Sequence, residues 1–185
     1  MKTLLRKIVL GALVFMSYTS SAVESVAPAP EKYRLKKGHS ISISDDQGEV
    51  IYSGQVNDSG NLISLFDFAQ LKNGIYSVEV NKDFIIEITE VKVSQGEAVL
   101  LKNSKKEIYK PVFRAENSKV FISKLGLDSN KMTVELYYED QLIYSDKVIG
   151  NPVLSRVYQL DTRLNGNYKA IVRTNNRVYV ENFKL

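Results

Sequence analysis

The chain has 185 residues, of which 25 are basic and 21 acidic, with one histidine and no cysteine. The lack of cysteine excludes disulfides, and a single histidine excludes an assembled zinc site or a Ser-His or Cys-His nucleophile. Three basic residues and no acidic one lie in the first 22 positions, so the remaining chain has 22 basic against 21 acidic residues and is not predicted to bind nucleic acid.

The N-terminus has the pattern of a secretory signal peptide, residues 1–22. Three basic residues precede a nine-residue apolar run at 8–16, and Ser20 and Ala22 are the small residues of a cleavage site before Val23. Nine apolar residues fall well short of the roughly 20 that a membrane-spanning helix needs. We therefore expect an exported protein without a membrane span, located in the periplasm or outside the cell after cleavage near Ala22.

The next segment, VESVAPAPE (23–31), predicts an extended Pro/Ala linker. Short β-rich runs follow, and in the first half they are SISIS (40–44), EVIYSGQV (49–56), LISLFDF (62–68), IYSVEV (75–80) and FIIEITEVKV (84–93). Runs of this length at spacings of about ten residues predict an all-β sandwich or barrel. The turns SDDQG and NDSGN suit hairpins and lack the ligand spacing of an EF-hand, so neither a metal nor a cofactor is predicted.

The second half repeats the first at a shift of 92 residues. VIYSGQV (50–56) aligns with LIYSDKV (142–148), and Gly74 and Tyr76 fall on a second Gly-x-Tyr at the same shift. Two anchors that keep one register over 22 residues indicate two copies of one domain.

The two copies are predicted at residues 32–103 and 104–185. The boundary falls in the charged stretch between Gly96 and Lys110, where the apolar alternation breaks down. The segment PVFRAENSKVFISK (111–124) has no counterpart before residue 32. It therefore predicts an extra early strand or hairpin in the second copy.

The repeated glycine and tyrosine suit the corner of an immunoglobulin-like sandwich. In such a corner an inward tyrosine donates its hydroxyl to backbone a few residues upstream, and a small residue before it lets the chain turn. The predicted corner residues are Leu71, Gly74, Tyr76, Leu164, Gly166 and Tyr168. We therefore predict two tandem immunoglobulin-like (Fn3-like) antiparallel β-sandwiches, and we assign these tyrosines a structural role rather than a ligand-binding one.

A family resemblance rests on two motifs of the first copy. D-x-x-G-x-V at Asp45, Gly48 and Val50, followed by L-x-x-G-x-Y-x-V-x-V at Leu71–Val80, resembles the C-terminal sorting domains of type IX secretion in Bacteroidota. The order is also similar to other tandem immunoglobulin-like modules that these bacteria export. The resemblance implies a small β-sandwich that export machinery recognises and usually cleaves at the outer membrane. The internal copy carries the closer match.

The predicted function is that of a non-catalytic binding or structural module whose partner is a protein or a glycan at the cell envelope. The candidate contact residues are Tyr137, Lys102, Lys105 and Lys106. Tyr137 precedes Tyr138, so the two face opposite sides of a strand unless a bulge intervenes. The lysines predict either a solvated connector or a weak site for an anionic glycan. Two alternatives remain open, namely a sorting signal read by type IX export machinery and a small-ligand or glycan site between the two domains.

Overall fold

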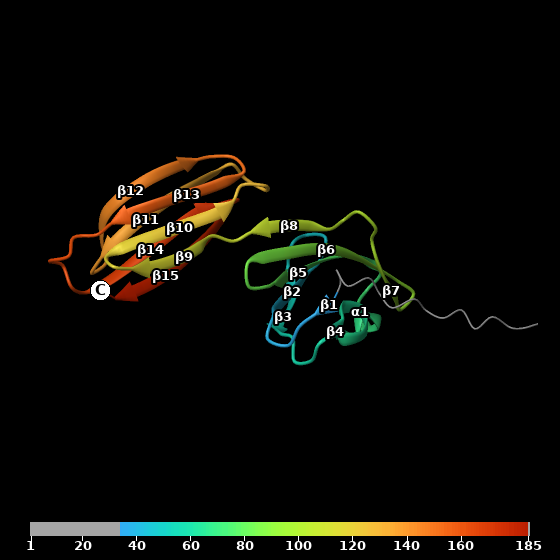
Figure 1. Cartoon of the computed structure of the whole chain (residues 1–185). Coiled ribbons are helices and arrows are strands. Elements are labelled where there is room, and N and C mark those ends of the chain that lie inside the picture. The colour runs from blue at the N-terminus through green and yellow to red at the C-terminus, as the bar shows by residue number, and fades with distance from the viewer. Residues whose placement is uncertain (1–33, 185) are drawn as a thin grey trace, which may run out of the picture.

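The computed structural model describes residues 34–184. The predicted signal peptide, the linker and the first residues of the predicted first domain lie outside the described residues. The described chain is almost entirely antiparallel β-structure in two units, the first formed by residues 34–109 and the second by residues 112–184 (Figure 1). The predicted all-β class is confirmed. None of the described helices is long and apolar enough to cross a membrane.

The first unit is one broad sheet with a short second layer. Its elements are β1 (Arg34–Leu35), β2 (Ser40–Ser44), β3 (Val50–Gln55), β4 (Gly60–Asn61), α1 (Leu62–Leu65), the 3-10 helix η2 (Phe68–Gln70), β5 (Gly74–Asn81), β6 (Ile85–Ser94), β7 (Glu97–Leu100) and β8 (Lys106–Tyr109). The sheet has the order β3-β2-β5-β6-β7, and β8 pairs with the first half of β6. The ribbon β1-β4, α1 and η2 form the second layer, because Leu35, Leu62 and Phe68 share one core with the sheet.

The segment 62–68 is the main local departure from the sequence prediction. LISLFDF was expected as a strand and instead forms α1 and leads into η2. Two side chains cause the change, because Asn61 accepts a hydrogen bond from the backbone N–H of Ile63 and Asp67 accepts one from Ala69. Each cap satisfies an N–H group that a strand would have paired with a neighbour.

The second unit is a sandwich of two sheets. Its strands are β9 (Val112–Glu116), β10 (Lys119–Leu125), β11 (Lys131–Tyr138), β12 (Gln141–Ile149), β13 (Val153–Gln159), β14 (Asn167–Thr174) and β15 (Arg177–Lys184). One sheet has the order β13-β10-β9 and the other β12-β11-β14-β15. The hairpin β9–β10 occupies the segment where the sequence predicts an extra strand or hairpin.

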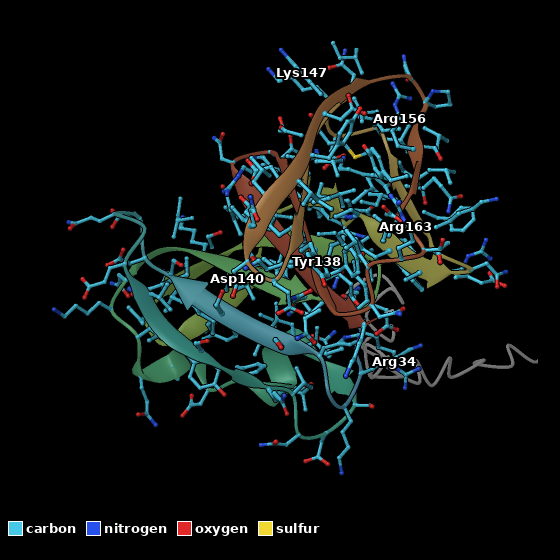
Figure 2. All side chains as sticks on the ribbon, turned by 90° about the vertical axis from the view of Figure 1, so that its left-hand side faces the viewer. Arg34, Tyr138, Asp140, Lys147, Arg156 and Arg163 are labelled. Carbon is cyan, nitrogen blue, oxygen red and sulfur yellow. The ribbon has the colours of Figure 1, made fainter. Side chains whose placement is uncertain are left out.

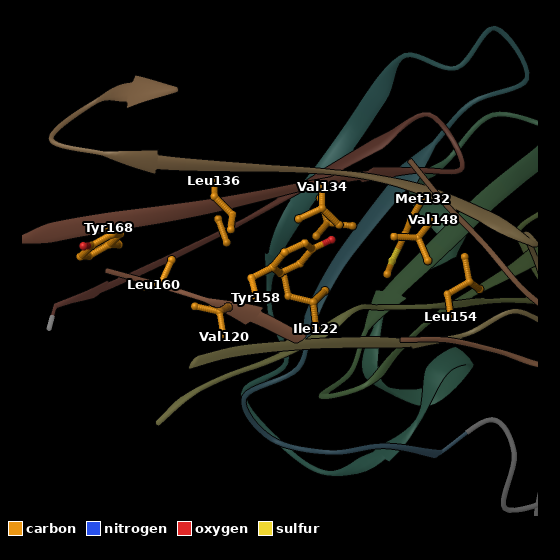
Figure 3. Close-up of a cluster of buried hydrophobic side chains, with 12 residues drawn as sticks. Val120, Ile122, Met132, Val134, Leu136, Val148, Leu154, Tyr158, Leu160 and Tyr168 are labelled. Atoms are coloured by element: carbon orange, nitrogen blue, oxygen red, sulfur yellow. The ribbon is translucent and has the colours of Figure 1, made fainter. Parts of the chain in front are cut away.

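Between these sheets lies a core of twelve buried side chains from both layers (Figure 3). Val120, Ile122 and Leu154 come from the three-stranded sheet, while Val134 and Leu136 come from the facing one. Alternation along each strand sends every second side chain into this layer. The opposite side of the sheet β12-β11-β14-β15 is therefore left to face outward.

The internal repeat is visible in the strand order. The sheet β3-β2-β5-β6 of the first unit corresponds to β12-β11-β14-β15 of the second, and the pair β1-β4 corresponds to β10-β13. The register agrees as well, since Tyr76 pairs with Val91 and Tyr168 pairs with Phe183, both at a shift of 92. The two units are thus two versions of one topology with second layers of different size.

The junction between the units follows β8. Hydrogen bonding joins β8 to β6, so the first sheet extends to Tyr109, past the boundary predicted at residue 103. The chain then crosses to β9 over two residues, Lys110 and Pro111 (Figure 1).

Candidate functional site

Both predicted corner tyrosines lie buried at equivalent places. The hydroxyl of Tyr76 donates to the backbone carbonyl of Lys72, and that of Tyr168 donates to the carbonyl of Leu164, each at 2.8 Å. Each bond reaches four residues upstream and ties the incoming loop to the strand that follows, which is the geometry of a tyrosine corner. The hydroxyls are therefore occupied by the fold.

The other corner residues are not equivalent in the two units. Leu71 packs against the first core, whereas Leu164 is 40% exposed and contributes its carbonyl, so its counterpart is Lys72. A Cβ added to Gly166 would lie 2.6 Å from Oε1 of Glu139, while one added to Gly74 would lie no closer than 3.7 Å to Tyr76. Only the second corner therefore requires glycine for space.

A buried polar network closes the end of the second unit that meets the first. Lys124 projects from β10 into the core side, only 2% exposed, and forms an ion pair with Asp128. The carboxylate of Asp128 also accepts hydrogen bonds from the side chain of Asn175 and, at 3.2 Å, from the backbone N–H of Tyr109. Asp128 thus connects β10 and the β14–β15 turn of the second unit to the last strand of the first.

A second set of contacts joins the outer face of the first sheet to the second unit. Arg177 donates through both terminal nitrogens to the carboxylate of Glu79, at 2.9 and 2.5 Å, and this hydrogen bonding raises the pKa of Arg177. Lys110 donates to the side chain of Asn81 at 2.9 Å. A bidentate pair fixes orientation as well as distance. The two units are therefore joined by directional contacts and not by the connecting residues alone.

An apolar hollow of about 190 Å³ lies beside this junction. Phe84 of the first unit and Val112, Leu125 and Val153 of the second line it. Phe84 is 66% exposed, and the three aliphatic side chains are 44–50% exposed. Large apolar side chains from two units thus converge on one open surface.

The predicted lysine run does not form one cationic patch. Lys105 forms ion pairs with Glu87 at 2.8 Å and with Glu107 at 2.7 Å, while Lys102 and Lys106 are exposed. Burial would lower the pKa of Lys105, but the two carboxylates outweigh it and raise that pKa. Lys105 is therefore committed to the first unit.

Tyr137 and Tyr138 follow a β-bulge, which shifts the register of β11 and β12 between Leu136 and Tyr137, and the two tyrosines face opposite sides of the sheet. The Tyr138 ring packs on Tyr168, with centroids 5.0 Å apart. Tyr137 lies on the outer face, where its hydroxyl donates to Glu135 and the ammonium of Lys169 lies 5.1 Å from its ring. Tyr137 is thus half-buried among charged neighbours.

The sequence prediction missed Phe84, Lys124, Asp128 and Arg177. Phe84 reads as the start of a strand, and Lys124 reads as a charged residue at the end of an apolar run. One signal was present, because Lys124 stands at the inward position that Val120 and Ile122 set.

Comparison with known families supports the resemblance for the first unit. Residues 27–94 match the secretion system C-terminal sorting domain. The sorting-domain match extends through β6 and covers the copy that the sequence motifs favoured. The predicted resemblance is thereby confirmed. No curated protein matches the chain. Among solved structures, extracellular domains 3–5 of Drosophila OTK are 8% identical, with 84% of this chain and 87% of that chain covered, at a TM-score of 0.25.

Proposed function

We propose that this protein is exported and non-catalytic, and that it acts by binding a partner protein at the cell envelope. The observation that supports this proposal is the apolar hollow at the junction of the two units. Phe84 and three aliphatic residues from two different units converge there and stay exposed, and exposed apolar patches of this kind mark interaction sites.

The size of the hollow favours a protein over a small ligand. Pockets for small molecules usually enclose roughly 300–1,000 Å³, and the junction hollow holds about 190 Å³. A volume of this size accommodates one large apolar side chain, which is how anchors at protein interfaces bind. The glycan or small-ligand site considered between the two domains is therefore the weaker alternative.

Site-specific crosslinking tests the proposal. A photoreactive phenylalanine analogue placed at position 84, in the full chain and in the native host, is expected to give one dominant crosslinked protein. The same analogue at Val99, which is 59% exposed on β7 of the first unit, is the matched control. Equal labelling from both positions, or none from position 84, would contradict the assignment.

A second candidate function is favoured by the family match at residues 27–94. The first unit would then serve as an address that type IX export machinery reads. To test this, residues 23–110 are fused behind a reporter that carries a signal peptide. Delivery of the reporter to the cell surface, and its loss in cells without that machinery, would favour sorting. Retention of the reporter in the periplasm would argue against it.

A further inference from the structure

The outer face of the sheet β12-β11-β14-β15 carries a concentration of basic side chains. They project from all four strands and are Lys131, Lys147, Lys169, Arg173 and Lys184. The carboxylates near them are Glu135, Glu139 and Asp140. A chain that is close to neutral after residue 22 thus places five of its 22 remaining basic residues on one sheet face.

These cations differ in whether they form ion pairs within the protein. Lys169 forms an ion pair with Asp140 at 2.6 Å, and Arg173 lies 3.5 Å from Glu135. Within the described chain, Lys131 and Lys147 have no ion-pair partner. Figure 2 shows Lys147 extending away from the ribbon of the second unit.

The internal repeat supplies a comparison inside the same chain. At the shift of 92, Gln55, Ser77 and Asn81 of the first unit occupy the places of Lys147, Lys169 and Arg173. The rows correspond in space, since Gln55 and Asn81 flank Ser40 as Lys147 and Arg173 flank Thr133, although the offset between β2 and β11 is 93 residues here instead of 92. Three neutral polar positions of one copy are therefore cations in the other. A fourth cation, Lys184, corresponds to Lys92 and is common to both copies, and each face also exposes apolar side chains, Ile75 in the first and Val178 in the second. The difference between the faces therefore lies in these three positions.

The basic side chains surround a hollow. Lys131, Lys147 and Arg173 line a depression of about 460 Å³ with Thr133 and the turn Asn175–Asn176. Adjacent strands lie about 4.8 Å apart, so the row Lys147–Thr133–Arg173 places two cations roughly 10 Å apart across the sheet. Along β14, Lys169 and Arg173 are roughly 13 Å apart at about 3.4 Å per residue.

We propose that this face binds an acidic polysaccharide, a polymer that bears carboxylate or sulfate groups at regular intervals. The cations provide the charge complementarity. Thr133, Ser145 and Asn182 lie among them on the same face and offer hydroxyl and amide partners for sugar hydroxyls. This mixture suits a glycan. Val178 and Val180 are exposed on the same face, and a lipid surface would select apolar side chains that insert, so lipid vesicles are included in the test. The inference rests on the proposed export and non-catalytic role but uses a different surface from the junction hollow.

The test uses a variant that gives the second copy the residues of the first, Lys147→Gln, Lys169→Ser and Arg173→Asn. Affinity electrophoresis of the full mature chain in gels containing polygalacturonate is expected to retard the wild type, with about tenfold weaker binding for the variant. The control Lys37→Gln, Lys72→Gln, Lys92→Gln removes three exposed basic residues from the first unit and is expected to bind within twofold of wild type. Gels containing neutral dextran are expected to retard none of them.

Several results would overturn the inference. These are no retardation of the wild type, an equal loss in the control variant, or binding to phosphatidylglycerol vesicles without binding to polygalacturonate. Should the triple variant misfold, Lys131→Gln with Lys147→Gln repeats the test at positions without ion pairs in the described chain. Crosslinking from position 84 does not involve this face, so a failure of the glycan proposal is distinguishable from a failure of the proposed function.

Discussion

At the scale of single residues, three buried tyrosine hydroxyls allow the stability contribution of a hydrogen bond to be compared with the cost of burying an unpaired hydroxyl. Tyr76 and Tyr168 donate to carbonyls at 2.8 Å, whereas the buried hydroxyl of Tyr179 has no hydrogen-bond partner within the described chain. We expect Tyr76→Phe and Tyr168→Phe each to lower the free energy of unfolding by about 1 kcal/mol. Tyr179→Phe should be neutral or stabilising, because it removes a polar group that burial penalises. Urea denaturation measures all three, and a loss at Tyr179 as large as at Tyr168 would refute this view.

Substitution of the two corner glycines by alanine is expected to change stability by different amounts. In Gly166→Ala the new Cβ would lie 2.6 Å from Glu139 and 2.8 Å from the ring of Tyr138, so we expect a loss of about 1–3 kcal/mol. Gly74→Ala meets only ordinary contacts and should change stability by less than about 0.5 kcal/mol. Thermal denaturation of both variants compares them directly. Equal losses would show that a backbone requirement, and not space, selects glycine.

His39 is the single histidine of the sequence, so its imidazole signals can be followed in proton NMR without overlap from other histidines. Burial and then the charge of Lys82 lower the pKa of His39 below 6.5, and its Nδ1 accepts a hydrogen bond from the N–H of Lys36. Because the unfolded chain then binds the proton more readily, stability should fall as pH drops below 6.5. Proton NMR should place the His39 midpoint below 6.5. A midpoint at or above that value would contradict the described environment.

At the scale of elements, the sequence predicts strands well and their partners less well. Alternation locates β2, β5 and the part of β6 from Thr89 onward, since one face of each is buried. It fails at α1 because the side-chain caps of Asn61 and Asp67 are local events that an apolar run does not reveal. The pairing of β8 with β6 could not be predicted from the sequence either, since it depends on the length of the intervening loop.

The turn between β11 and β12 contains no glycine, and a long-range hydrogen bond stabilises it instead. Glu139 and Asp140 adopt φ values of 44° and 63°, which glycine or asparagine would adopt more readily. The carboxylate of Glu139 accepts the backbone N–H of Asn167 at 2.8 Å and so holds the turn against the start of β14. A long-range contact thus offsets an unfavourable local conformation.

The buried ion pair of Lys124 and Asp128 is expected to stabilise the end of the second unit that contacts β8. Lys124→Met leaves the Asp128 carboxylate buried without its cation, and we expect a loss of about 3 kcal/mol. Adding Asp128→Asn removes the unpaired charge while keeping an acceptor for Tyr109, so the double variant should recover part of the loss. Urea denaturation of the single and double variants gives the interaction free energy between positions 124 and 128. A double variant no more stable than Lys124→Met would contradict the proposed cost of the unpaired Asp128 carboxylate.

At the scale of the whole molecule, one topology occurs twice with different surfaces. The first unit matches a sorting-domain family and has Gln55, Ser77 and Asn81 where the second unit, with its full second layer, has three cations. The sequence revealed the repeat through strands that the core constrains. It did not reveal the surfaces, because outward positions follow no period that marks them as functional.

The most direct test of the central claim, that both units act together as one exported module, is intact mass spectrometry of the protein from its native host. Periplasm and culture medium are analysed separately. We predict a species that begins at Val23 and retains both units, because the junction contacts of Asp128 and Arg177 join them. A species outside the cell that lacks everything after about residue 110 would contradict the claim and make the second unit a removable segment.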